Sequence, residues 1–82
     1  MGIHVSHLRM RWVVPMHEYW VVPVGKAWLV RADGIEPEGF DEKMRAILRA
    51  EGLARANRPS EVIVLDRGGG VEQRRSFNEG SR

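Results

Sequence analysis

The chain of 82 residues contains no cysteine. This absence excludes a disulfide framework, thiolate zinc sites, iron–sulfur clusters and cysteine nucleophiles. Long apolar runs are also absent, since none approaches the roughly 18 residues of a membrane span, and no basic segment followed by an apolar one opens the chain as in a signal peptide. We therefore expect a soluble, cytoplasmic protein that does not engage a membrane.

Size and charge set further limits. The composition, with 43% hydrophobic and 29% charged residues, is that of one small globular domain. Thirteen Lys and Arg against eleven Asp and Glu leave a net charge of +2. Residues 1–41 carry four cations and five acids, whereas residues 42–82 carry nine cations and six acids. The positive second half is compatible with an acidic partner or nucleic acid, and equally with a solvated helix face and a basic tail.

Short apolar runs separated by turn residues fill the first half of the chain. Trp12–Pro15 and Trp20–Pro23 repeat the motif Trp-Val-Val-Pro, and each is typical of a strand that ends at a proline. A third strand is expected at residues 27–31, after a turn at Gly25. Residues 35 and 36 are candidates for a further, brief strand before Pro37.

An amphipathic helix is expected next. Asp41 is a suitable N-cap residue, and Pro59 limits the helix at its other end. Apolar residues recur with a 3.6-residue period between these limits. The stripe predicts that three side chains face the sheet and contact Trp28, Val62 or Val64. These three are Met44, Ile47 and Leu48.

The remaining residues predict two strands joined by a tight turn. Glu61–Leu65 is apolar at consecutive positions, which is typical of a strand that is central in a sheet or covered on both faces. Gly68–Gly70 is suited to a hairpin turn, and Val71–Arg74 to a polar edge strand. The predicted fold class is therefore α+β, with one helix packed across a small, mostly antiparallel sheet. The expected order is strand, strand, short strand, helix, strand, strand.

The residues that usually carry chemistry do not assemble into a recognisable site. The three histidines, His4, His7 and His17, lack neighbouring ligands in a metal-binding pattern. Gly68–Gly70 leads into a strand, whereas a phosphate-binding loop leads into a helix. No serine is accompanied by an organised base and acid. We expect no catalytic residue, no metal and no cofactor, and hence a protein that is not an enzyme.

Three tryptophans, Trp12, Trp20 and Trp28, recur at a spacing of eight residues. An even spacing along strands returns a side chain to the same face, provided that no turn intervenes. Two interpretations remain open. The rings form a platform on which nucleic-acid bases stack, or they fill the core beneath the helix.

Three stretches of the chain contain motifs that can be compared with those of a known protein family. The first is the hairpin made by Trp20–Pro23 and Trp28–Val30. The second is the helical segment Asp41–Ala54, with its Ala-Ile and Leu-Ala pairs. The third is the strand Glu61–Val64 with the turn Asp66–Val71.

Over residues 19–77 these motifs resemble a family of small bacterial proteins classed as domain of unknown function 2188. The resemblance implies a small sheet with one helix. No activity is established for the family, so the resemblance implies no functional residue. The chain departs from the pattern at three positions, where Arg45 replaces a glutamate, Gly69 replaces an aspartate, and Val71 replaces a charged residue.

The part of the chain before the resemblance is open to two interpretations. We divide the chain into an N-terminal extension (1–18), a single α+β domain (19–77) and a flexible tail (78–82). If Met16 is the natural start, residues 1–15 are an added leader. Alternatively, the repeated strand pairs at a sheet edge in the same molecule or in a second copy. The candidate self-association residues are Trp12, Val13 and Val14.

The sequence favours a non-catalytic binding or accessory module, whose partner is another protein or a second copy of the chain. The alternative is a nucleic-acid-binding domain that uses a basic helix face and the last hairpin. The candidate contacts for nucleic acid are Arg45, Arg49, Arg55, Arg67, Arg74 and Arg75.

Overall fold

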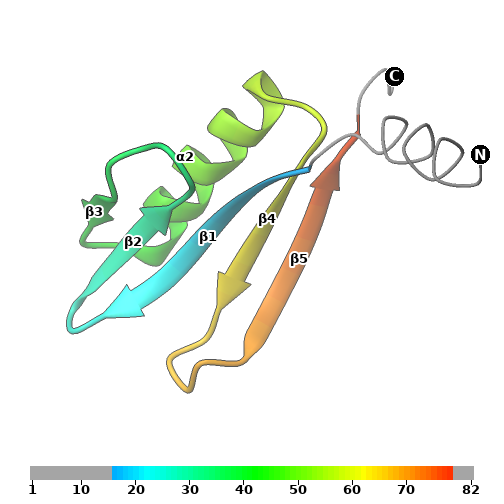
Figure 1. Cartoon of the computed structure of the whole chain (residues 1–82). Helices are drawn as coiled ribbons and strands as arrows, with labels where there is room; N and C mark the ends of the chain where they lie inside the picture. Colours follow the sequence, from blue (N-terminus) through cyan, green and yellow to red (C-terminus); the bar gives the residue numbers. More distant parts are fainter. Residues whose placement is uncertain (1–15, 79–82) are drawn as a thin grey trace, which may run out of the picture.

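The computed structural model describes residues 16–78. Figure 1 shows five strands and one helix in this part of the chain. In chain order the elements are β1 (His17–Val24), β2 (Ala27–Arg31), β3 (Glu38–Phe40), α2 (Lys43–Ala56), β4 (Ser60–Leu65) and β5 (Val71–Phe77). The predicted α+β class and the predicted order of elements are confirmed.

The strands form a single sheet in the order β3-β2-β1-β4-β5. Three neighbouring pairs are antiparallel, and the central pair of β1 and β4 is parallel. A parallel pair needs a crossover connection, and here the crossover contains β2, β3 and α2. The apolar strand β4 has a neighbour on both sides, and the polar strand β5 lies at an edge, as the sequence predicts.

The two predicted hairpin turns are present and explain the glycines within them. Gly25 and Gly69 have φ angles of 60° and 93°, which residues with a side chain adopt rarely. In the turn before β5 the Asp66 carboxylate accepts hydrogen bonds from the amides of Gly68 and Gly70, at 2.9 and 3.0 Å. The amide of Gly69 donates to the carbonyl of Asp66 at 3.0 Å. The glycine amides thus stabilise the turn by donating to Asp66 of the same turn, and they are not directed at a phosphate site.

The core lies between α2 and one face of the sheet. Alternate strand residues point towards the helix, and Val21 is paired with Val30 on one side and Val64 on the other. The helix contributes mainly small side chains, and the core is closed by aromatic rings at both ends. The core residues are Tyr19, Val21, Trp28, Val30, Ala46, Ile47, Ala50, Ala54, Val62, Val64 and Phe77.

The helix is rotated relative to the sequence prediction. Ile47 is buried as expected, but Met44 and Leu48 are 62% and 61% exposed, so the prediction for these two residues is wrong. Ala46, Ala50 and Ala54 face the sheet instead. Their small side chains allow the helix to approach the strands closely. The same rotation turns Glu51 towards β5, where Arg75 pairs with it.

Two further expectations from the sequence are wrong, and a third concerns residues that the structure does not describe. The N-cap position is occupied by Glu42 without a side-chain hydrogen bond, so Asp41 is not the cap. The brief third strand comes after Pro37, at Glu38–Phe40, because Phe40 pairs with Trp28. The predicted self-association strand (Trp12, Val13 and Val14) lies outside the described residues and stays a prediction.

Replacing Ile47 with Ala should lower the free energy of unfolding by about 2–5 kcal/mol, because it leaves a cavity between α2 and the sheet. The matched control is Leu48→Ala on the exposed side of the same helix, which should change stability by no more than about 0.5 kcal/mol. Urea unfolding followed by circular dichroism measures both. Equal losses for the two variants would contradict the observed rotation of the helix.

Candidate functional site

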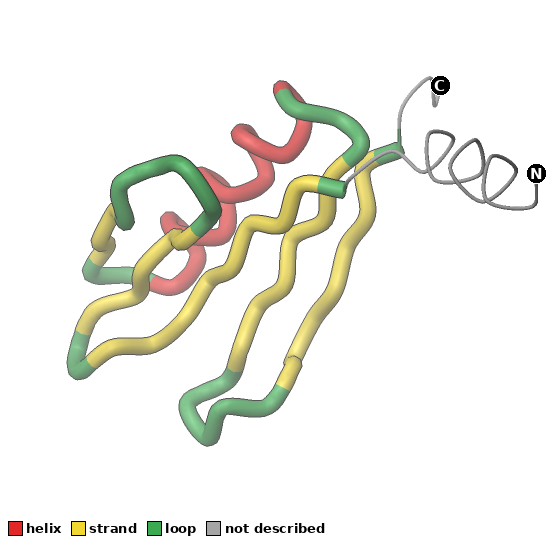
Figure 2. Tube along the Cα trace, in the orientation of Figure 1, coloured by secondary structure: helices red, strands yellow, loops and turns green. Residues whose placement is uncertain are grey.

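The two faces of the sheet are covered unequally. Within residues 16–78 the helix lies against one face, and no described element lies on the other (Figure 2). Val62 and Val64 of β4 point into the core beneath the helix. Ile63, which lies between them, therefore points to the opposite side. We call this side of the sheet the uncovered face.

A central row of the uncovered face runs across four strands. Trp20 on β1 is paired with Arg31 on β2 and with Ile63 on β4. Ile63 is in turn paired with Arg74 on β5. The row therefore has an apolar centre and a cation at each end.

The neighbouring rows differ in polarity. On the side where β1 begins, Glu18 is paired with Glu61, and this row is acidic. On the side of the two hairpin turns, the rows are apolar. They contain the pairs Val22–Leu29, Leu65–Val71 and Val24–Ala27. The uncovered face thus combines an apolar area near the hairpins with an acidic border at its other end.

Several side chains on this face pack against one another. Ile63 is fully buried although no described element covers it, since its row neighbours Trp20 and Arg74 flank it. Leu29 extends over Gly39 of β3, where an added Cβ would lie 3.3 Å from a Leu29 methyl group. Val71 remains about half exposed. The apolar surface is therefore continuous from β3 to β5.

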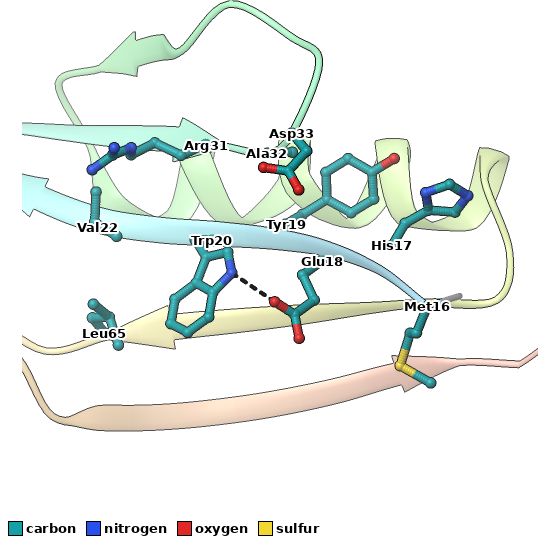
Figure 3. A pocket seen from close by; sticks show the side chains of 10 residues that line it. All are labelled: Met16, His17, Glu18, Tyr19, Trp20, Val22, Arg31, Ala32, Asp33 and Leu65. Atoms are coloured by element: carbon teal, nitrogen blue, oxygen red, sulfur yellow. Dashed lines mark hydrogen bonds between the residues drawn. The ribbon is translucent and has the colours of Figure 1, made fainter. Parts of the chain in front are cut away.

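A hollow of about 620 Å³ lies over the part of this face formed by β1 and β2 (Figure 3). Trp20, Val22 and Leu65 are among its apolar lining residues. The indole Nε1 of Trp20 donates a hydrogen bond of 3.3 Å to Oε1 of Glu18. Within residues 16–78 the guanidinium of Arg31, also in the lining, has no ion-pair partner. The hollow is thus lined by apolar side chains together with the charged side chains of Glu18, Arg31 and Asp33.

The six arginines predicted to contact nucleic acid do not gather on one surface. Arg55 and Arg75 lie beside the end of the helix, where both pair with the buried carboxylate of Glu51 at 3.8 and 3.1 Å. Both guanidinium groups also lie over the ring of Phe77, at 5.5 and 5.2 Å from its centre. These two cations are engaged in closing the core.

The other four arginines are dispersed. Arg67 lies 4.8 Å from the ring centre of Trp28, and its Nη1 donates to the Gly25 carbonyl at 2.9 Å. Arg49 pairs with Glu38 at 3.0 Å. On the uncovered face Arg74 pairs with Glu61 at 3.1 Å. Arg45 is exposed on the helix and has no ion-pair partner among the described residues.

The tryptophans are also separated. Trp28 is buried beneath the helix, and Lys43 and Arg67 lie over its ring. Trp20 is on the uncovered face. The hairpin turn at Gly25 breaks the even spacing, because it pairs Trp28 with Pro23 and not with Trp20. The two rings therefore do not form a common platform, and Trp12 lies outside the described residues.

Sequence reasoning missed most of the uncovered face. Trp20 and Arg74 appeared among the candidates, but Val22, Arg31 and Leu65 did not. One signal was present: the consecutive apolar residues of β4 indicate a strand with two apolar faces, whereas one helix covers only one of them. The pairing that brings Arg31 beside Trp20 depends on the hairpin register.

No cluster of three or more potential metal ligands occurs within residues 16–78. In the same part of the chain, the helix is too short and too polar to cross a membrane.

Replacing Arg75 with Ala should cost about 1–2 kcal/mol of stability, because buried Glu51 then keeps only the longer contact with Arg55. Arg45→Ala is the matched control, and its effect should stay within about 0.5 kcal/mol. Thermal unfolding in low and high salt measures both. If Arg75→Ala is as stable as Arg45→Ala, the cation does not contribute to the core.

The chain was compared with known proteins. The family model described as an uncharacterized protein conserved in bacteria (DUF2188) matches residues 19–77, and the chain therefore belongs to this family. Neither the curated proteins nor the solved structures gave a match.

Proposed function

We propose that this member of the DUF2188 family is a cytoplasmic, non-catalytic module that binds another protein chain through the uncovered face of its sheet. The observation that carries the proposal is the composition of β4. Val62 and Val64 face the helix, while Ile63 and Leu65 face away from it. A strand with one solvent-facing side usually alternates apolar and polar residues, and β4 does not.

The neighbouring strands extend this apolar area. Trp20, Val22 and Leu29 are only partly exposed, and they lie side by side with the outward residues of β4. Transfer of such a surface from water to a protein contact is favourable, in proportion to its apolar area. A contiguous apolar patch with a polar border is typical of interaction sites.

The uncovered face has charged residues around an apolar centre, as protein interfaces commonly do. Arg31 and Arg74 stand at the two ends of the central row, and Glu18 and Glu61 form the acidic row. Protein interfaces are commonly apolar at the centre and polar at the rim, and Trp and Arg are frequent among the residues that dominate the binding energy. Trp20 occupies the central position here.

The substitution Val22→Glu tests this proposal, because it places a charge in the apolar area without removing a core residue. We compare affinity purifications from the native host. The amount of each protein that the unmodified chain retains should fall roughly tenfold with this variant. The matched control is Leu48→Glu, which places the same charge on the exposed side of the helix. Equal retention by both variants, with unchanged melting temperatures, would contradict the proposal.

A nucleic-acid-binding role is the second candidate, and the central row favours it. An aromatic ring on an open sheet offers a stacking surface for a base. In the same row Arg31 beside Trp20, and Arg74 beside Ile63, are cations near that surface, and Arg74 is already paired with Glu61. This arrangement shares only Arg74 with the six predicted arginines. The acidic row beside it disfavours a polyanion.

The two candidates differ in their dependence on salt. Binding that neutralises several phosphates weakens steeply with salt, whereas an apolar protein contact does not. A mobility titration with generic duplex and single-stranded nucleic acid at two salt concentrations separates them. We expect no retention even at low salt. Retention that is lost in Arg31→Ala and persists in Arg45→Ala would support the nucleic-acid role instead.

A further inference from the structure

We propose that the partner on the uncovered face is a second copy of this chain, packed sheet against sheet with its strands running in the opposite direction. This inference rests on the proposed function, because it identifies the occupant of the same surface. Three properties of the uncovered face carry it: its shape, its charge distribution and the positions of its most exposed apolar residues.

The shape favours another sheet as the occupant. Two twisted sheets pack face to face about 10 Å apart, with their strands inclined by roughly 30°, because each has the same hand of twist. A second copy meets this condition because its sheet has the same twist. Four strands of five to eight residues cover roughly 20 by 20 Å, so a pair of copies buries on the order of 800 Å². This area lies just below the lower limit for a stable specific interface, about 1,000 Å², and is that of a weak dimer.

The charges select between two symmetric alignments. A two-fold axis parallel to the strands would place Glu18 and Glu61 of one copy against the acidic row of the other, and like charges in contact are unfavourable. An axis across the strands reverses one sheet and places each acidic row over the hairpin end of the other copy. The axis across the strands is therefore preferred.

The ends of β1 indicate what the reversed alignment brings together. Glu18 lies four residues before Val22 on β1, and Lys26 lies in the hairpin turn just beyond Val24. If the axis passes through Val22, the Glu18 end of one copy lies over the hairpin turn of the partner subunit, which carries the partner's Lys26. Lys26 is exposed and has no ion-pair partner within residues 16–78. The reversed alignment therefore places these unlike charges together at both ends of the interface.

The same alignment covers the exposed apolar groups. Val24 is 50% exposed, and it lies two residues beyond Val22, whereas Trp20 lies two residues before it. Reversal about Val22 places the indole of Trp20 over Val24 of the partner subunit. Val71, which is 52% exposed, pairs with Leu65, and Leu65 is level with Val22, so Val71 lies in the row through which the axis passes. The second copy therefore covers the two large apolar side chains of the uncovered face that are most exposed, Val24 and Val71.

Sedimentation equilibrium of the full chain over a range of concentrations tests the inference. The apparent mass should rise from 9.4 kDa towards twice that value. Val22→Glu should raise the dissociation constant at least roughly tenfold. The full-length control Leu48→Glu on the helix should leave it unchanged. Val14→Glu makes the same change at the corresponding position of the repeated motif and is the competing test: this inference expects no effect, whereas association through Trp12–Pro15 expects a weaker dimer. In concentration-dependent NMR spectra, the indole signal of Trp20 should shift and that of Trp28 should not.

Charge reversal tests the alignment. Glu18→Lys and Lys26→Glu should each weaken the dimer roughly threefold or more, because each dimer contains two such pairs. The double variant should recover most of the lost affinity. Weakening by each single variant without recovery in the double variant would exclude the reversed alignment.

Other outcomes assign the face to another occupant. A chain that stays monomeric up to roughly 1 mM overturns the inference. If Val22→Glu still reduces protein capture from the host, the proposed function stands and only the second copy is wrong. A dimer that Val22→Glu leaves intact and Val14→Glu dissociates also overturns the inference, because it assigns association to the Trp12–Pro15 strand. If neither association nor capture responds to Val22→Glu, both proposals fail.

Discussion

The described fold depends on one constraint: a single helix can cover only one face of the sheet, whereas the interior strand β4 is apolar on both of its faces. The parallel pairing of β1 with β4 requires a crossover, and this crossover carries α2 across one face. The helix buries Val62 and Val64, while Ile63 and Leu65 are left on the other side. The uncovered face is therefore a direct consequence of the topology, and its apolar composition is the basis of the proposed binding role.

Because the core is small, charged residues help to cover it. The helix contacts the sheet mainly through alanines, so the aromatic rings at the two ends of the core would face water unless other side chains covered them. Lys43 and Arg67 lie over Trp28 at one end, and two arginines held by Glu51 lie over Phe77 at the other. Much of the positive charge in the second half of the chain is thus engaged within the domain, which leaves less of it for a nucleic-acid surface.

Much of the fold could be predicted from local patterns. The Val-Val-Pro run of β1, the consecutive apolar residues of β4 and the glycine turns each indicate one structure by themselves. The rotation of α2 could not be predicted in this way. Met44 and Leu48 fit an apolar stripe as well as Ala46 and Ala50 do, so periodicity allows either side to face the sheet. Close packing of the alanines and the pairing of Glu51 with Arg75 decide between them, and both depend on residues distant in sequence.

The sequence by itself determined the type and order of the elements, because these follow from periodicity and turn residues within a few positions. It also indicated that β4 is apolar on both faces. Only the tertiary structure decided which residues share a face. The hairpin turn pairs Trp28 with Pro23, and Trp20 with Arg31, while the parallel pairing places Ile63 beside Trp20. Side chains alternate along each strand, so a shift of one residue in register would exchange the two faces, and register is determined by contacts between distant segments.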